Sequence, residues 1–212
     1  FLLVKNWSNI FRYLKILLIG VPIWFVFSIL LTFSPEVSQA INKGFQANAA
    51  ISLMLGYIGV SLGDIIAGIA SQKLKSRKKP IFIFLFLLLI NIILYLFFSY
   101  NIIIFYLFNF TLGLFSGYWV LFLTIGAEEF GTNIRATVVN TLPNFVRGSV
   151  FFITILFKSI KTKLVELKLV FIEPTGFIDT TILIGLICFT FSFLSLTLIK
   201  ETFAKDLNFN EE

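Results

Sequence analysis

The chain has 212 residues, of which 58% are apolar and only 13% are charged, whereas soluble domains carry about a quarter charged residues. A soluble fold of this size cannot bury 28 phenylalanines that lie mostly in long uncharged runs. With no histidine and a single cysteine, Cys188, the chain lacks the residues for an internal disulfide, a zinc-protease motif or a histidine-based triad. We therefore expect no enzyme, no bound metal and no cofactor. The net charge of +6 comes from basic residues between the apolar runs, which is typical of topology control and not of nucleic-acid binding.

Six apolar stretches are long enough to cross the hydrocarbon core of a membrane, which takes about 20 helical residues. The sequence therefore predicts an all-α integral membrane protein with a bundle of six transmembrane helices over residues 16–199. We expect residues 1–15 to form a cytoplasmic interfacial segment and residues 200–212 to form a frayed cytoplasmic tail. The predicted spans cover about residues 16–33, 47–70, 81–98, 102–125, 137–157 and 178–199.

Basic residues are distributed unevenly between the two sides of such a bundle. Six spans put both chain ends on one side, and that side holds twelve lysines and arginines against five on the other. The positive-inside rule places both termini in the cytoplasm, and we expect the chain in a bacterial inner membrane.

Polar residues at membrane depth are costly, so they mark functional candidates. In the first span, Pro22 is expected to kink the helix, and Trp24 and Ser28 follow it. Both side chains are candidates for contact with a solute, although Trp24 also fits an anchor at the membrane interface.

The second predicted span carries two distinct faces. Tyr57, Ser61 and Asp64 share one of them, and we treat Tyr57 and Ser61 as cavity candidates. Asp64 fits two roles, a charge that changes partner or protonation during transport, and a static hydrogen bond to a neighbouring helix. The other face is predicted to pack against another helix, because its residues are small. Its members are Ser52, Gly56, Gly59, Gly63 and Ala67.

Two later spans add three further candidates. Asn109 belongs to a polar, glycine-containing stripe on the fourth span, with Ser116 beside it, and this stripe either lines a solute path or packs tightly. Arg147, near the start of the fifth span, fits a pair with an acidic loop residue, snorkelling to headgroups or contact with an anionic substrate. The third and sixth spans are expected to face lipid.

Three segments on the predicted cytoplasmic side resemble signatures of the major facilitator superfamily, in the order of its second six-helix half. Residues 68–79 resemble its Gly-x-x-x-Asp-Arg-x-x-Gly-Arg-Arg loop, with Arg77 in the basic run and Gln72 where the acid is expected. Residues 128–135 resemble the Glu-x-Phe-Pro-Thr-x-x-Arg signature of sugar-porter-like members, in which Glu128 and Arg135 keep their spacing. Residues 200–204 resemble Pro-Glu-Thr-Lys-Gly, with Glu201 retained.

The resemblance implies one half of a two-bundle transporter that works by alternating access. It implies that cytoplasmic signature charges hold one conformation and separate in the other, with Glu128 or Glu129 pairing with Arg135. It also implies that the first and fourth spans line the central cavity. The residues expected to couple conformation to transport are Asp64, Gln72, Arg77, Glu128, Glu129, Arg135 and Glu201.

These patterns together predict the C-terminal half of a secondary transporter for a small polar solute, such as a sugar, an organic acid or a compatible solute. Coupling to protons or another ion is expected, and the partners are the bilayer, the solute and an N-terminal six-helix half, with no nucleic acid. A chain that starts at Phe1 is expected to be a fragment of a longer protein. The alternatives are a stand-alone six-helix channel or structural membrane protein and, less favoured, an integral-membrane enzyme.

Overall fold

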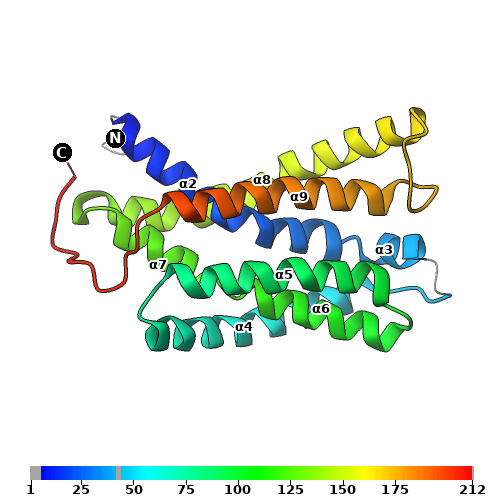
Figure 1. Cartoon of the computed structure of the whole chain (residues 1–212), viewed down its shortest axis with the longest axis horizontal. Coiled ribbons are helices and arrows are strands. Elements are labelled where there is room, and N and C mark those ends of the chain that lie inside the picture. The colour runs from blue at the N-terminus through cyan, green and yellow to red at the C-terminus, as the bar shows by residue number, and fades with distance from the viewer. Residues whose placement is uncertain (1–5, 42–43, 212) are drawn as a thin grey trace.

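In the computed structural model, which describes residues 6–41 and 44–211, every regular element is a helix (Figure 1). Five helical stretches are long and apolar enough to cross a membrane: Trp7–Leu31, Ala49–Leu74, Lys78–Phe98, Ile102–Glu129 and Phe177–Leu198. The described chain is therefore all-α, with the composition that a membrane protein requires. The elements are α2 (Trp7–Phe25), η1 (Val26–Leu31), α3 (Ser34–Ile41), α4 (Ala49–Leu74), α5 (Lys78–Phe98), α6 (Ile102–Ser116), α7 (Trp119–Glu129), α8 (Thr132–Glu166) and α9 (Phe177–Leu198).

The fifth predicted span lies within α8, which has 35 residues but is not among the five apolar stretches. Asn140, Asn144 and Arg147 interrupt the apolar run of its first half. A membrane crossing by α8 is therefore an expectation based on its length and on its place in the bundle.

Two predicted spans have irregular features. The first begins earlier than expected, since residues 7–15 belong to the same helix as the apolar run, while residues 1–5 of the predicted interfacial segment lie outside the described residues. That helix contains Pro22 and continues as the π-helical turn η1, in which the Thr32 N–H donates to the Phe27 carbonyl oxygen at 3.2 Å. The fourth span breaks at Gly117 and Tyr118 into α6 and α7.

Asparagine side chains fix the starts of three helices. Asn6 accepts a hydrogen bond from the Ser8 N–H, Asn48 from the Ala50 N–H and Asn101 from the Ile104 N–H. Such caps satisfy backbone donors that have no partner within the helix. They explain why these helices begin where they do, directly after loop residues.

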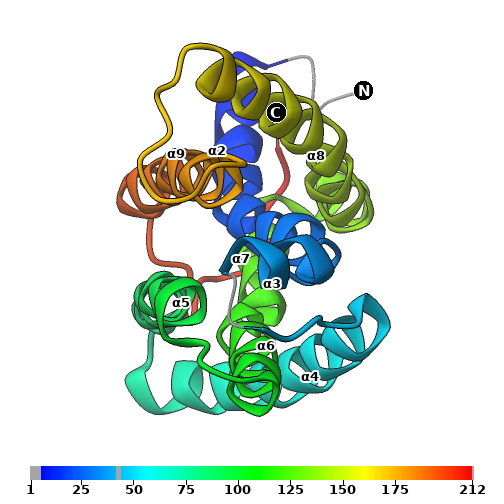
Figure 2. The same cartoon turned by 90° about the vertical axis from the view of Figure 1, so that its right-hand side faces the viewer.

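The helices form two groups, α2 with α8 and α9, and α4 with α5 and α6 (Figure 2). α7 packs against members of both groups, and the described chain ends lie at the same end of the bundle (Figure 1). α2 with η1 is the most buried candidate span and α4 the least, with 72% and 22% of their most apolar stretches buried.

α4 and α6 meet backbone to backbone along their small residues, which confirms the packing face predicted for the second span. An added Cβ at Gly63 would lie 2.0 Å from the Leu114 carbonyl oxygen, and one at Gly113 would lie 2.0 Å from that of Gly56. No side chain fits such distances, so these glycines set how closely the two helices approach.

Candidate functional site

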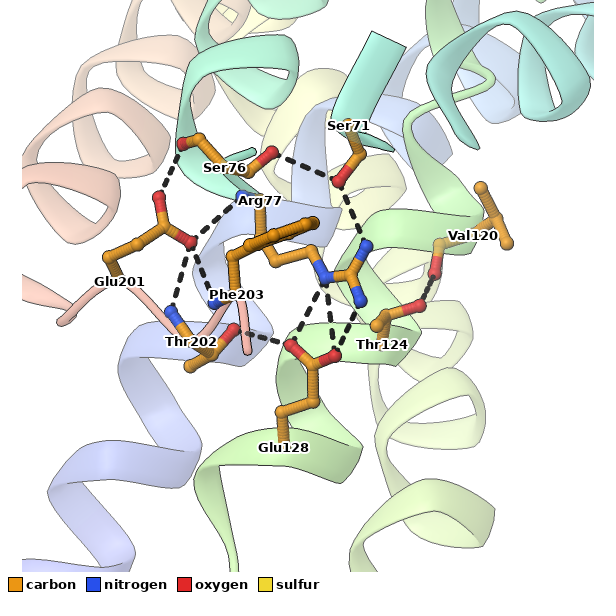
Figure 3. A network of polar contacts seen from close by, with 9 residues as sticks. All are labelled: Ser71, Ser76, Arg77, Val120, Thr124, Glu128, Glu201, Thr202 and Phe203. Carbon is orange, nitrogen blue, oxygen red and sulfur yellow. Dashed lines mark hydrogen bonds and ion pairs between the residues drawn. The ribbon is translucent and has the colours of Figure 1, made fainter. Parts of the chain in front are cut away.

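Arg77, at the start of α5, lies at the centre of a polar network that joins three segments of the chain (Figure 3). Its Nη2 lies 2.7 Å from the Glu128 Oε1 at the end of α7, and its Nε donates to both carboxylate oxygens at 3.2 Å. Its Nη1 donates to the Ser71 hydroxyl at 2.9 Å. The side chains of Arg77 and Glu128 are only 15% and 11% exposed, so water screens this pair little.

The C-terminal tail supplies the third segment of the network. The Thr202 hydroxyl donates to the Glu128 Oε2 at 2.7 Å, and the Phe203 ring lies with its centroid 5.0 Å from the Arg77 Cζ. Glu128 is thus shared by a cation from the α4–α5 loop and a hydroxyl from the tail. Separating either segment from α7 would break a charge-assisted contact.

Glu201 binds the N-terminus of α5, where backbone N–H groups lack helical partners. Its carboxylate accepts hydrogen bonds from the Arg77 N–H at 2.8 Å, from the Lys78 N–H at 3.4 Å and from the Ser76 hydroxyl. Burial by itself raises the pKa of Glu201, but these donors, together with the Phe203 N–H, lower it below its ordinary value of 4.5. The tail therefore holds α5 through an ionised carboxylate at a favourable helix end.

The predicted pairing of Glu128 or Glu129 with Arg135 is not formed in this structure. Arg135 donates instead to the carbonyl oxygens of Phe130 and Leu207, while the Glu129 carboxylate forms an ion pair with Lys205 at 3.7 Å. α7 ends at Glu129 and α8 begins at Thr132, so Glu128 and Arg135 lie in different helices. Gln72, in the position of the expected acid, is exposed and lies outside the network.

Asp64 makes the static hydrogen bond that was one of its two expected roles. Its Oδ1 accepts from the Val120 N–H at 3.0 Å, in the first turn of α7. A carboxylate at a helix N-terminus is electrostatically favourable. Asp64 therefore links α4 to α7 at the point where the fourth span breaks.

The tail is not frayed, contrary to the sequence-based expectation. The Thr132 N–H donates to the Phe209 carbonyl oxygen at 2.8 Å, and the side-chain amide of Asn133 donates to the Glu211 carbonyl oxygen and accepts from the Glu211 N–H. The Glu211 carboxylate lies 2.6 Å from the Arg12 Nη2 and accepts from the Gly131 N–H. The tail therefore also binds the start of α2 and the α7–α8 turn.

Four predicted cavity residues lie together in the interior of the bundle. Trp24, Ser28 and Tyr57 line a cavity of 380 Å³, and a smaller adjoining cavity of 160 Å³ is lined by Trp24, Tyr57 and Arg147. Trp24 and Tyr57 lie about 10–12 Å from the same end of the bundle, because seven or eight residues separate them from the helix ends at Leu31 and Ala49. On helical stretches of 25 and 26 residues, this is about a third of the way along each helix.

The other three predicted cavity residues do not line these cavities. Asn109 and Ser116 are fully buried, and the Asn109 Nδ2 donates to the Ser52 hydroxyl at 2.8 Å across the α4–α6 contact. Ser116 and Ser61 donate to carbonyl oxygens of their own helices. Of the two expected roles of the stripe on the fourth span, the structure therefore shows tight packing.

An exposed polar stripe on α8 was missed in the sequence. Thr137, Asn140, Asn144 and Arg147 recur every three or four residues, and all four are exposed. This spacing puts them on one face of a helix, so the pattern was visible in the sequence. The stripe leads from the end of the bundle that holds the network to the cavities beside Trp24.

The described residues contain no cluster of histidine, cysteine, aspartate or glutamate that could hold a metal ion. The polar chemistry of the bundle is instead divided between a charged network at one end and an aromatic cavity inside it. Comparison of the sequence with known protein families and with curated proteins finds no match.

Proposed function

We propose that this chain is the C-terminal six-helix half of a transporter of the major facilitator type, and that it moves a small polar solute across a bacterial inner membrane. In this proposal α8 is the sixth membrane-spanning helix and both termini are cytoplasmic. A second bundle of similar size completes the transporter, and the two bundles rock about a site between them.

The observation that carries the proposal is the cavity beside Trp24. A structural membrane protein has no need of an aromatic cavity with a nearby arginine at membrane depth, since ionisable groups there are costly. The cavity volume of 380 Å³ suits a small solute. The exposed stripe from Thr137 to Arg147 supplies polar side chains along a route towards it.

The network around Arg77 supports alternating access. It joins α5, α7 and the tail at one end of the bundle, where a gate must close and open. A coupling of about 1–3 kcal/mol between such a network and the solute site changes the populations of two conformations by roughly 5–150-fold. In the proton-coupled form of the proposal, Asp64 carries the proton, because it lies in α4 about 15 Å from the Leu74 end and touches α7.

The exposed faces of α4 and α8 support a second bundle as the partner. Met54, Ile58 and Ile65 on α4 are each about half exposed, and Phe151 and Phe152 on α8 are exposed by 64% and 72%. Lipid covers apolar side chains of this kind, but it does not match the polar stripe on α8. A partner bundle enclosing a water-filled path matches both surfaces.

Counterflow in proteoliposomes tests the function. We expect the chain alone to show no saturable exchange of labelled sugars, organic acids or amino acids, and we expect exchange when it is reconstituted with its N-terminal bundle. Saturable exchange by the monomeric chain alone would contradict the half-transporter proposal and favour a stand-alone channel or carrier.

Cysteine labelling tests the orientation. In a Cys188→Ser background, an impermeant maleimide added outside intact cells should label Thr162→Cys and miss Lys75→Cys; both native side chains are exposed. Labelling of Lys75→Cys alone would invert the proposed topology, and labelling of both would show that the chain does not hold one orientation.

A further inference from the structure

The cavities beside Trp24 offer a cation and hydrogen-bond groups without partners. Arg147 makes no hydrogen bond or ion pair with any described residue, and its Cζ lies 5.1 Å from the centroid of the Trp24 ring. The Trp24 Nε1 and the Ser28 hydroxyl are buried and likewise have no partner in residues 6–41 and 44–211. Buried polar groups of this kind are rare in folded proteins, and each calls for a water, an ion or a ligand.

Within the described part of the chain, the lining of the two cavities carries positive charge and no negative charge. None of the described residues that line these two cavities is an aspartate or a glutamate, and Arg147 is the one charged side chain among them. Asp64 on α4 does not line either cavity, and its carboxylate accepts a hydrogen bond from the Val120 N–H. The cavity therefore favours a ligand that brings its own negative charge.

The walls of the smaller cavity are largely aromatic. Trp24, Phe27, Tyr57 and Trp119 line the smaller cavity, with the Trp24 and Trp119 rings edge to face at 6.1 Å and the Phe27 and Tyr57 rings 5.0 Å apart. Aromatic walls favour a flat apolar body through offset or edge-to-face contacts. The guanidinium is held against the Trp24 face by a cation–π contact, which leaves its N–H edge available for a carboxylate.

We infer that the solute is an organic anion, a carboxylate attached to a small flat apolar body. The carboxylate binds the Arg147 guanidinium, and the apolar body lies against Trp119 and Tyr57. This inference rests on the proposed function for its biological meaning, but the binding step stands on the cavity alone.

Tryptophan fluorescence provides a direct test, because two of the three tryptophans line the cavity and the third, Trp7, is 74% exposed near the chain start. The purified chain carrying Trp7→Phe, in lipid nanodiscs, is titrated with benzoate, with the neutral benzamide and with the cationic benzylamine. We expect saturable perturbation by benzoate and affinity at least roughly tenfold weaker for benzamide, since a charged hydrogen-bond partner is lost. Equal affinity for all three probes, or preference for benzylamine, would overturn the inference.

Arginine variants show whether the preference comes from this site. Arg147→Gln should abolish the advantage of benzoate over benzamide, Arg147→Lys should keep part of it, and Lys163→Gln, which removes a cation from the last turn of the same helix, should leave it unchanged. Helicity by circular dichroism checks that each variant folds, and Arg147→Lys keeps the test valid if Arg147→Gln does not fold. An unchanged preference in Arg147→Gln would reject the assignment and leave Arg147 as a residue that binds lipid phosphate.

The binding assay separates this inference from the transport proposal. Benzoate binding without counterflow in the completed transporter would reject transport and retain the anion site. Counterflow of a neutral sugar without benzoate binding would retain transport and reject the anion site.

Discussion

Breaking the Arg77–Glu128 pair should destabilise the bundle far more than removing Arg135, the residue that the family signature pairs with Glu128. In Arg77→Gln, Glu128 keeps only the Thr202 hydroxyl as a donor within the network, and its side chain is only 11% exposed in the native structure. Removing one partner of a buried ion pair costs about 3–5 kcal/mol. Because both side chains keep some exposure, we expect about 3 kcal/mol for Arg77→Gln.

Arg135→Gln is the matched control, since Arg135 donates only to the carbonyl oxygens of Phe130 and Leu207. Losing such neutral acceptors costs about 1 kcal/mol. Combined with Glu128→Gln, Arg77→Gln should show a coupling energy of about 2 kcal/mol, and Arg135→Gln should be additive within about 0.5 kcal/mol.

The measurement is a double-mutant cycle on the free energy of unfolding, with sodium dodecyl sulfate titrated into mixed micelles and helicity followed by circular dichroism. Coupling of Glu128 to Arg135, with additivity of Glu128 and Arg77, would refute the network and restore the pairing that the signature implies.

Three further outcomes are expected. Gly63→Ala should lower the unfolding free energy by about 1–3 kcal/mol, because its Cβ would collide with the α6 backbone, whereas Gly68→Ala on the same helix meets nothing within 4 Å and should raise it by about 0.5–1 kcal/mol. The folded-state pKa of Glu201 is lowered, so its contribution is present above pH 4.5 and is lost as the pH falls through the lower value. The thermal unfolding temperature should therefore fall more at acidic pH in the wild type than in Glu201→Gln. Glu211→Gln should release the tail from Arg12 and speed its trypsin cleavage, with helicity unchanged.

The helices were largely predictable because lipid-facing segments must be continuously apolar. Apolar runs located five of the candidate spans, and the small residues of α4 identified its packing face. The break at Gly117 could not be predicted from the apolar runs, because the helices on both sides of it are apolar. It depends on the close approach of Gly117 to Gly63 in a different helix, where an added Cβ would lie 2.3 Å from the backbone.

The pairing of charges was not predictable, because it depends on tertiary structure. Arg77 and Glu128 are 51 positions apart, and Thr202 is a further 74 positions along the chain. The spacing of Glu128 and Arg135 favoured a local pair, but the chain turns between them and sends Arg135 towards the tail. In the cavity, Trp24, Ser28, Tyr57 and Arg147 were identified individually, since each is polar or aromatic at membrane depth, and the fold brought them together.

The tail connects the two helix groups, and the two ends of this connection differ in strength. Next to α5, the Thr202 hydroxyl of the tail donates to the Glu128 carboxylate in α7, and these two residues are only 1% and 8% exposed. At α2 the charged contact of the tail is Glu211 with Arg12, and the Arg12 side chain is 26% exposed. Water and salt weaken the more exposed pair more. If the two groups separate at this end during transport, the Glu211 end should therefore release first while Glu201 and Thr202 remain with α5, so that the tail moves with the α4–α5–α6 group.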